Sequence, residues 1–150
     1  MLVVVGCFSK YAHFLPLSYP YTAITVARLF FDNVVKLHGI PESIVSNRDV
    51  TFTSSFWKQL FQLSRTKLNF NSSYHPQFDG QTEVVNRTLG NMLRAILGKN
   101  LKQWEYILPQ VEFAYNRTLH STTNKTPFEI VYGFNPLTHL DLSPLPHPEL

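Results

Sequence analysis

The chain has 150 residues, enough for one domain with a sizeable core but not for two domains of ordinary size. Hydrophobic residues make up 44% of it and charged residues 15%, a balance that excludes general disorder and favours a soluble globular domain. The net charge of +3 is compatible with nucleic-acid binding without requiring it. The single cysteine, Cys7, excludes an internal disulfide, and no run approaches the roughly 20 apolar residues of a membrane span. With no targeting segment visible, we expect a nuclear or cytoplasmic protein.

The first half of the chain alternates predicted strands and helices. Strands are expected over residues 1–8, 12–17, 42–46 and 67–70. The first is continuously apolar, so we expect it to be buried and paired with the second as a hairpin. Apolar residues spaced by three and four predict a helix over 22–38, and Gly39 and Pro41 end it. Ser54 caps a further helix over 54–63, with Phe56, Leu60 and Leu63 on its core face.

The second half is mainly helical. A polar loop over 71–79 precedes predicted helices over 80–99, 101–117 and 127–132, the second interrupted near Pro109. The core stripe of the first of these helices is expected to comprise Val85, Leu89, Met92 and Ile96. Residues 1–135 therefore read as one α/β domain, followed by a Pro-rich tail over 136–150.

Two segments of the chain contain polar residues whose spacing indicates a catalytic site. Residues 45–52 follow a predicted strand, and residues 73–83 lead from a loop into a helix. Thirty-five residues lie between Asn47 and Glu83. In the integrases of retroviruses and long-terminal-repeat retrotransposons, the same number of residues separates an Asp from a Glu, and an earlier Asp completes the DDE triad.

The chain resembles the integrase catalytic core of gypsy-class long-terminal-repeat retrotransposons. Four blocks carry the resemblance: residues 3–14, 75–83, 112–116 and 127–133. It implies a ribonuclease H-like α/β fold, in which helices pack on a five-stranded mixed sheet. It also implies DNA integration dependent on Mg²⁺ or Mn²⁺, with element ends and target DNA as partners, and it is compatible with a homo-oligomer.

The chemistry implied by the resemblance needs carboxylates. Two Mg²⁺ ions about 3.5–4 Å apart would clamp the attacking and leaving oxygens, and such hard cations prefer carboxylate oxygens. Glu83 stands at the position of the family's Glu, and the positive amino end of its helix would favour a phosphate nearby. Glu83 and Asn47 are therefore the candidate catalytic and metal-binding residues.

Two departures from the family pattern weaken that chemistry. Asn47 replaces the second Asp, and its neutral amide cannot bridge two cations. Asp49, two residues on, is not a ligand in the family. By the resemblance, the first Asp lies upstream of Met1, on a strand that would fill the centre of the sheet between residues 3–8 and 43–46. We therefore expect an incomplete core, in which those strands either pair directly or leave the fold destabilised.

Several other residues could contact nucleic acid. His75 and Gln77 lie in the loop before the site, although a loop His before Pro is more often a hydrogen-bonding turn residue, and shaping a mobile loop is the favoured role for Gln77. Basic residues continue beyond Glu83 and form either a phosphate-contacting face or an ordinary solvated surface; they are Arg87, Arg94, Lys99 and Lys102. Phe56, Trp57 and Phe61 are expected in the core or at a dimer interface.

We interpret the chain as a degenerate integrase fragment with little or no strand-transfer activity. A non-catalytic module that binds DNA or protein, and a non-functional genomic remnant, are the alternatives.

Overall fold

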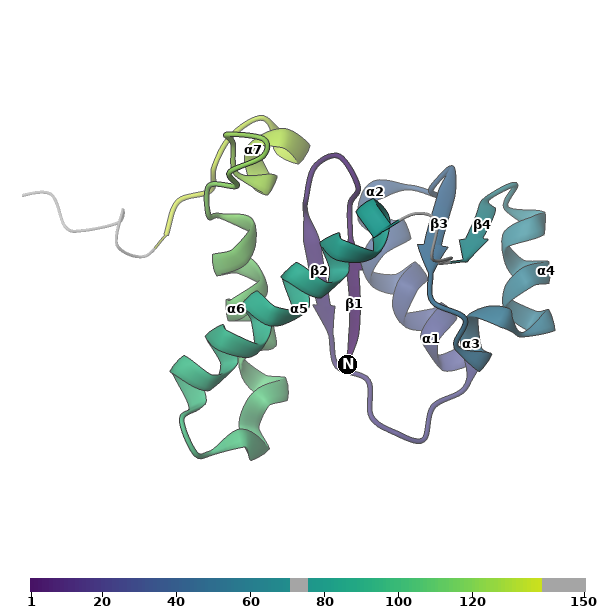
Figure 1. Cartoon of the computed structure of the whole chain (residues 1–150), viewed down its shortest axis with the longest axis horizontal. Helices are drawn as coiled ribbons and strands as arrows, with labels where there is room; N and C mark the ends of the chain where they lie inside the picture. Colours follow the sequence, from purple (N-terminus) through teal and green to yellow (C-terminus); the bar gives the residue numbers. More distant parts are fainter. Residues whose placement is uncertain (71–75, 139–150) are drawn as a thin grey trace, which may run out of the picture.

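A computed structural model describes residues 1–70 and 76–138 of the chain, without the side chains of residues 76–83 and 101 (Figure 1). Four short strands form two separate two-stranded sheets, β1–β2 and β3–β4. Helices surround both sheets, so the α/β class is confirmed. No helix of the described residues is long and apolar enough to cross a membrane.

The first sheet is the predicted hairpin. Strands β1 (Leu2–Val5) and β2 (Ala12–Leu15) pair antiparallel, with Leu2 opposite Leu15 and Val5 opposite Ala12. All four residues of β2 are buried, whereas β1 is only half-buried, and Phe8 is 92% exposed. The expectation of a buried strand over 1–8 is therefore wrong, because among the described residues nothing pairs with the far edge of β1.

The helical segment that follows matches its predicted limits. Helix α1 (Ala23–Phe30), a π-helical turn η1 (Phe31–Val35) and α2 (Lys36–His38) run on continuously. The Thr22 hydroxyl accepts a 3.3 Å hydrogen bond from the backbone N–H of Thr25, which caps the first turn. Gly39 follows with φ of 81°, a conformation that glycine adopts without strain, and so ends the segment.

The second sheet is parallel. Strands β3 (Ser43–Ser46) and β4 (Lys67–Phe70) pair directly, joined by α3 (Val50–Thr53) and α4 (Ser55–Leu63). Ser54 caps α4 as predicted, with its hydroxyl 3.2 Å from the backbone nitrogen of Trp57. The predicted core face of α4 is wrong in part, because Phe56 is 41% and Leu63 85% exposed. Trp57 and Phe61 are buried instead, since they face α1 and pack on Phe30.

The remaining helices lie on the other side of the hairpin. They are α5 (Pro76–Leu97), a short 3-10 turn η2 (Leu101–Gln103), α6 (Trp104–Asn116) and α7 (Pro127–Tyr132). Helix α5 begins four residues before the predicted start at Gly80, and α6 continues through Pro109 without a break. Ile96 is 58% exposed and does not belong to the core stripe, which continues through Met92 and Leu93.

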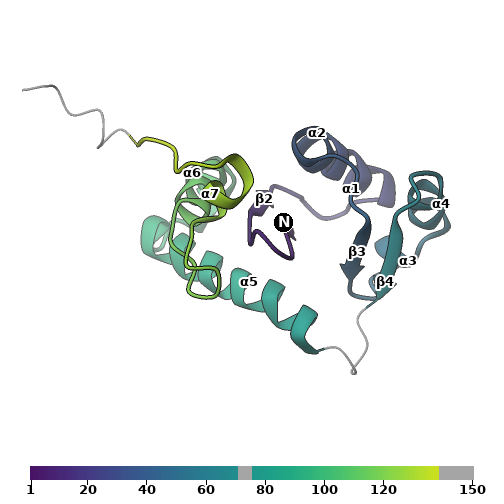
Figure 2. The ribbon, with the colours of Figure 1, turned by 90° about the horizontal axis from the view of Figure 1, so that it is seen from above.

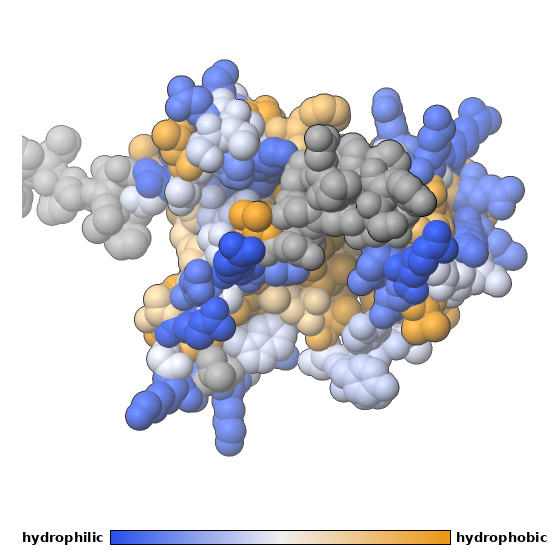
Figure 3. Space-filling model, viewed as in Figure 1, coloured by the Kyte–Doolittle hydropathy of each residue, from blue (hydrophilic) through white to orange (hydrophobic). Residues whose placement is uncertain are grey.

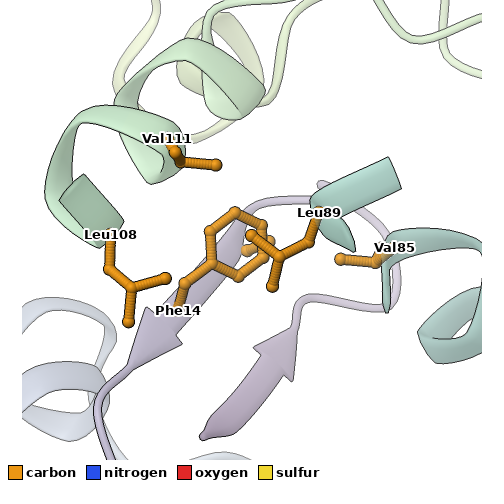
Figure 4. Packing of buried hydrophobic residues seen from close by; sticks show 6 residues of the cluster. Phe14, Val85, Leu89, Leu108 and Val111 are labelled. Carbon is orange, nitrogen blue, oxygen red and sulfur yellow. The ribbon is translucent and has the colours of Figure 1, made fainter. Parts of the chain in front are cut away.

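The hairpin separates two hydrophobic cores, as the view from above shows (Figure 2). On one face, Phe14 packs among Val85 and Leu89 of α5 and Leu108 and Val111 of α6 (Figure 4). On the other face, Leu2 and Val4 pack against the core formed by α1 and α4. Because Val3 and Val5 pack on the α5–α6 side, the alternation of β1 serves both cores.

The outer edge of β2 is sealed by side chains of α6. The Asn116 amide accepts from the backbone N–H of Ala12 and donates to its carbonyl, both at 2.8 Å. Glu112 Oε1 accepts from the N–H of Phe14 at 2.7 Å. Asn116 is fully buried and reproduces both bonds that a neighbouring strand would make with Ala12. The sequence marked residues 112–116 as part of the resemblance, and the structure assigns them this role.

The inner edges of the two sheets do not meet. Among the described residues β1 pairs only with β2, and β3 pairs only with β4. The first of the two expected outcomes, direct pairing of the segments around residues 3–8 and 43–46, is therefore wrong. The predicted core with an incomplete sheet is confirmed in this form.

Candidate active site

Asn47 lies where a strand ends, directly after β3, and its side chain is exposed. Its Oδ1 accepts a 3.2 Å hydrogen bond from the backbone N–H of Asp49. The amide oxygen is thus engaged in a local turn. A neutral, engaged oxygen is a weak ligand for a hard divalent cation, and it offers no charge to hold two of them together.

Asp49 does not replace the missing carboxylate. It is the N-cap of α3, and its Oδ1 accepts a 2.9 Å hydrogen bond from the backbone N–H of Thr51. The backbone carbonyl of Asp49 also accepts from the Thr53 hydroxyl at 3.1 Å. This carboxylate has a structural task at the start of a short helix, which explains an acidic residue here without a metal.

The other half of the predicted site belongs to α5. Gln77 and Glu83 fall within this helix, but their side chains lie outside the described part of the chain, and His75 lies outside it altogether. Since α5 begins at Pro76, Glu83 is about two turns into the helix rather than one. The helix dipole acts mainly within the first turn, so the predicted electrostatic help beside Glu83 is smaller than expected.

The described residues do not fit a two-metal centre. No group of three His, Cys, Asp or Glu side chains within them converges on a point where a metal ion could bind. Of the two proposed ligands, only Asn47 belongs to the described part, and it contributes one amide oxygen.

The predicted basic residues are exposed. Arg87 and Arg94 are seven residues apart on α5, close to two full turns, so they share one face of the helix. Arg94 donates a 2.9 Å hydrogen bond to Asn91, which lies between them on that face. Lys99 follows the helix and Lys102 lies in η2, and both are exposed.

Sequence reasoning missed a second basic group, which lies beside Asn47. The Arg48 guanidinium is 5.8 Å and the Lys58 ammonium 6.0 Å from the centre of the Phe70 ring. Both cations are exposed, and neither forms an ion pair with a described residue. Arg48 belongs to the block 45–52, but no local pattern indicates that β4 and α4 bring Phe70 and Lys58 to it.

A partly buried polar cluster lies at the other end of the hairpin. His13 Nε2 is 2.8 Å from His38 Nε2, and His13 Nδ1 is 3.5 Å from Glu112 Oε1. Partial burial of the ring, and then the nearby His13, lower the pKa of His38 below its ordinary value of 6.5. Burial likewise raises the pKa of the adjacent Tyr11.

No family model matches the chain. Over 148 residues, 99% of its length, it is 37% identical to the transposon Tf2-3 polyprotein of Schizosaccharomyces pombe. The matched segment is 11% of that polyprotein, so the chain spans about a tenth of the length of the curated relatives that it matches. The chain is homologous to this segment of the Tf2 polyproteins.

Solved structures share its fold. The integrase catalytic core domain of HTLV-2 in complex with magnesium superposes with a TM-score of 0.70 at 19% identity, covering 87% of this chain and 82% of that one. An integrase catalytic core of BIV gives 0.67 at 22% identity, covering 87% and 84%. A chain of the simian T-cell lymphotropic virus intasome gives 0.72 at 16% identity, covering 98% and 51%. The fold is therefore that of a ribonuclease H-like integrase catalytic core.

Proposed function

We propose that this chain is an integrase-domain fragment of gypsy-class retrotransposon origin, which binds the DNA backbone but does not catalyse strand transfer. The homology to the Tf2 polyproteins and the fold of the integrase cores support the integrase origin. The activity and partners of a whole polyprotein do not pass to a segment of it, so binding and inactivity depend on the residues of the chain itself.

The observation that carries the binding proposal is the pair of exposed cations over Phe70. A phosphate contact needs a cation that is accessible and is not already neutralised by a neighbouring carboxylate. Arg48 and Lys58 meet both conditions within the described residues. Arg87 and Arg94 add two exposed charges on one face of α5. Such contacts attract the backbone of any sequence, so the proposed binding is not sequence-specific.

Asn47 is the residue that accounts for the proposed loss of strand transfer. A two-metal mechanism needs charge at the bridging position, and an amide supplies none. Removing one preorganised electrostatic group from an active site commonly lowers the rate on the order of 10²–10³-fold. The magnesium bound in the HTLV-2 core belongs to that protein, and for this chain we propose at most weak binding of Mg²⁺ or Mn²⁺ by Glu83 with Asn47.

The binding test measures the affinity for a short labelled DNA duplex by fluorescence anisotropy at several salt concentrations. We expect affinity to fall with salt, and each lost phosphate contact to reduce the log–log slope by about 0.9. Arg48→Ala and Lys58→Ala should each reduce it. Lys36→Ala, which removes the same charge from exposed α2, is the control and should leave it unchanged. Equal effects of all three variants would contradict the proposed surface.

The catalytic test incubates the purified chain with oligonucleotide ends and either Mg²⁺ or Mn²⁺. We expect no joined product. Metal-dependent joining that Glu83→Gln abolishes would refute the inactive reading, and it would leave the salt-dependent binding as a separate result.

A further inference from the structure

One polar side chain interrupts the apolar hairpin. Of the residues in β1 and β2, His13 alone is polar, and its side chain is only 6% exposed. Figure 3 shows hydrophobic surface over the hairpin, in the middle of the face that it presents. A polar ring is costly to bury among apolar residues unless its nitrogens have partners. Both partners of His13 come from other elements, Glu112 from α6 and His38 from α2.

Glu112 determines which nitrogen of His13 carries the proton. Its Oε1 lies 3.5 Å from His13 Nδ1 and accepts a 2.7 Å hydrogen bond from the backbone N–H of Phe14, which holds the carboxylate in place. A carboxylate accepts and does not donate, so the proton of the neutral ring is assigned to Nδ1. The lone pair of His13 Nε2 therefore points toward His38. A carboxylate behind an imidazole is also the arrangement that orients histidine ligands of metal ions.

His38 brings a second imidazole nitrogen to the same point from the solvent side. It is the last residue of α2 and is exposed, and its Nε2 lies 2.8 Å from Nε2 of His13. Since His13 Nε2 holds a lone pair, the proton between the two nitrogens belongs to His38. Exposure of His38 lets this proton move through solvent to its own Nδ1. Two lone pairs then face each other on neutral rings, which is the form of histidine that binds metal.

The helical segment that carries His38 also favours a cation here. The segment runs continuously from α1 through η1 into α2, and its carbonyl end, which has partial negative charge, is at His38. The π-helical turn η1 directly precedes α2. A π turn includes one more residue than an α turn, so it rotates the side chains that follow it about the helix axis. Such turns are frequent at functional sites, and this one comes immediately before the residue that reaches His13.

We propose that His13 and His38 together bind one divalent cation of the imidazole-preferring class, such as Zn²⁺, between their Nε2 atoms, with water completing its coordination. Zn–N distances are about 2.0–2.1 Å, so two nitrogens of a tetrahedral site lie roughly 3.3 Å apart. The two rings must therefore separate by about 0.5 Å, which the exposed His38 can supply.

The proposed site is distinct from a magnesium centre. It has two protein ligands, which agrees with the absence of any group of three among the described residues. Mg²⁺ prefers oxygen ligands, so we expect it not to bind between two imidazoles. The inference does not rest on the proposed DNA binding, and it does not involve Asn47 or Glu83.

The experiment titrates Zn²⁺ into the whole chain by isothermal titration calorimetry, with Mg²⁺ as the metal control. All samples carry Cys7→Ser, because the exposed thiol would compete for Zn²⁺. We expect His38→Gln to weaken Zn²⁺ binding at least about tenfold, since it removes one of two ligands. His120→Gln is the matched control, because His120 bonds to Thr122 in another part of the chain, and it should leave the affinity unchanged. Equal affinities of the parent chain and His38→Gln would overturn the proposal.

NMR of chain labelled with ¹⁵N-histidine tests which atoms hold the ion. Without metal, we expect the proton of His13 on Nδ1 and that of His38 on Nε2. Saturation with Zn²⁺ should place both protons on Nδ1 and shift the resonances of both Nε2 atoms. Unchanged Nε2 resonances of His13 and His38 at saturation would overturn the proposal even if calorimetry detects binding, because the ion would then lie elsewhere.

A thermal melt covers the case in which the chain alone is poorly folded. Zn²⁺ at about 100 times its dissociation constant should raise the Tm by roughly 5–10 °C, whereas Mg²⁺ should not. His38→Gln should remove this rise and His120→Gln should keep it. A transition that Zn²⁺ does not move, or the absence of a cooperative transition both with and without Zn²⁺, would overturn the proposal.

Discussion

The β1–β2 hairpin has two outer edges, and their backbone groups have different surroundings. Beyond β2, Asn116 and Glu112 of α6 take up the backbone groups of Ala12 and Phe14. Beyond β1, the backbone groups of Val3 and Val5 meet a cleft. A sheet edge can therefore be closed by side chains as well as by another strand, and the edge lacking such side chains keeps its backbone groups unpaired among the described residues.

The largest expected effect comes from removing the seal of β2. Asn116→Ala leaves the buried N–H and C=O of Ala12 without partners, and each lost partner costs about 1–3 kcal/mol. We expect the free energy of unfolding in urea to fall by about 2–5 kcal/mol.

Asn91→Ala is the matched control for that variant. Asn91 is exposed and its side chain bonds only to Arg94 among the described residues, so the change should stay within about 0.5 kcal/mol. If Asn116→Ala were equally mild, the side-chain seal would not be what holds the edge of β2.

A pair of proline variants compares the two sides of β1 directly. Val4→Pro removes an N–H that faces β2, opposite His13, whereas Val3→Pro removes one that faces away from β2, because its partner Phe14 directs its own N–H outward to Glu112. The side-chain change is identical, and both residues are half-buried. We expect Val4→Pro to lower the free energy of unfolding by about 1–3 kcal/mol more, because it alone breaks a ladder bond. Equal losses in urea titrations would mean that the deduced phase of the ladder is wrong.

The periodicity of the sequence predicts where the helices lie along the chain, but it does not predict which of their faces is buried. Spacings of three and four located α1 and α4, yet the buried face of α4 depends on where α1 lies, and so Phe56 and Leu63 were misplaced. Likewise, the bonds of Asn116 to Ala12 join residues 104 positions apart, and no local pattern predicts such a bond. The block containing Asn116 could be recognised as a signature while its role could not.

At the candidate site, too, local positions are predictable from the sequence, whereas contacts between distant elements are not. The position of Asn47 after a strand follows from a short apolar run bounded by polar residues, and the structure has it there. The cluster of Arg48, Lys58 and Phe70 draws on three elements that become neighbours only when the parallel sheet forms. The spacing between Asn47 and Glu83 is a property of the sequence alone, and how their side chains meet stays a prediction.

A smaller effect is expected at Glu112, the more exposed member of the seal. Its side chain is 24% exposed, and its Oε1 accepts from Phe14 and lies near His13. Glu112→Gln keeps a carbonyl acceptor for Phe14 but removes the charge, so we expect a loss of about 1 kcal/mol in urea unfolding. Glu112→Leu removes the acceptor as well and should cost more. Equal losses for the two variants would show that charge, rather than edge closure, is what Glu112 contributes.

The smallest effect concerns pH, at the end of the hairpin where His13 meets His38. Partial burial, followed by the neighbouring His13, lowers the pKa of His38 in the folded chain below 6.5. The unfolded chain then binds the proton more readily, so stability is complete above about pH 6.5 and declines as the pH falls toward the lowered value. Glu112 and Tyr11 lie beside the same cluster, but Tyr11, whose pKa is raised, stays neutral throughout this range. We expect the Tm of the chain to fall between pH 7 and pH 5, and His38→Gln to reduce that fall. If Tm fell by the same amount in the variant, the acid sensitivity would belong to a group other than His38.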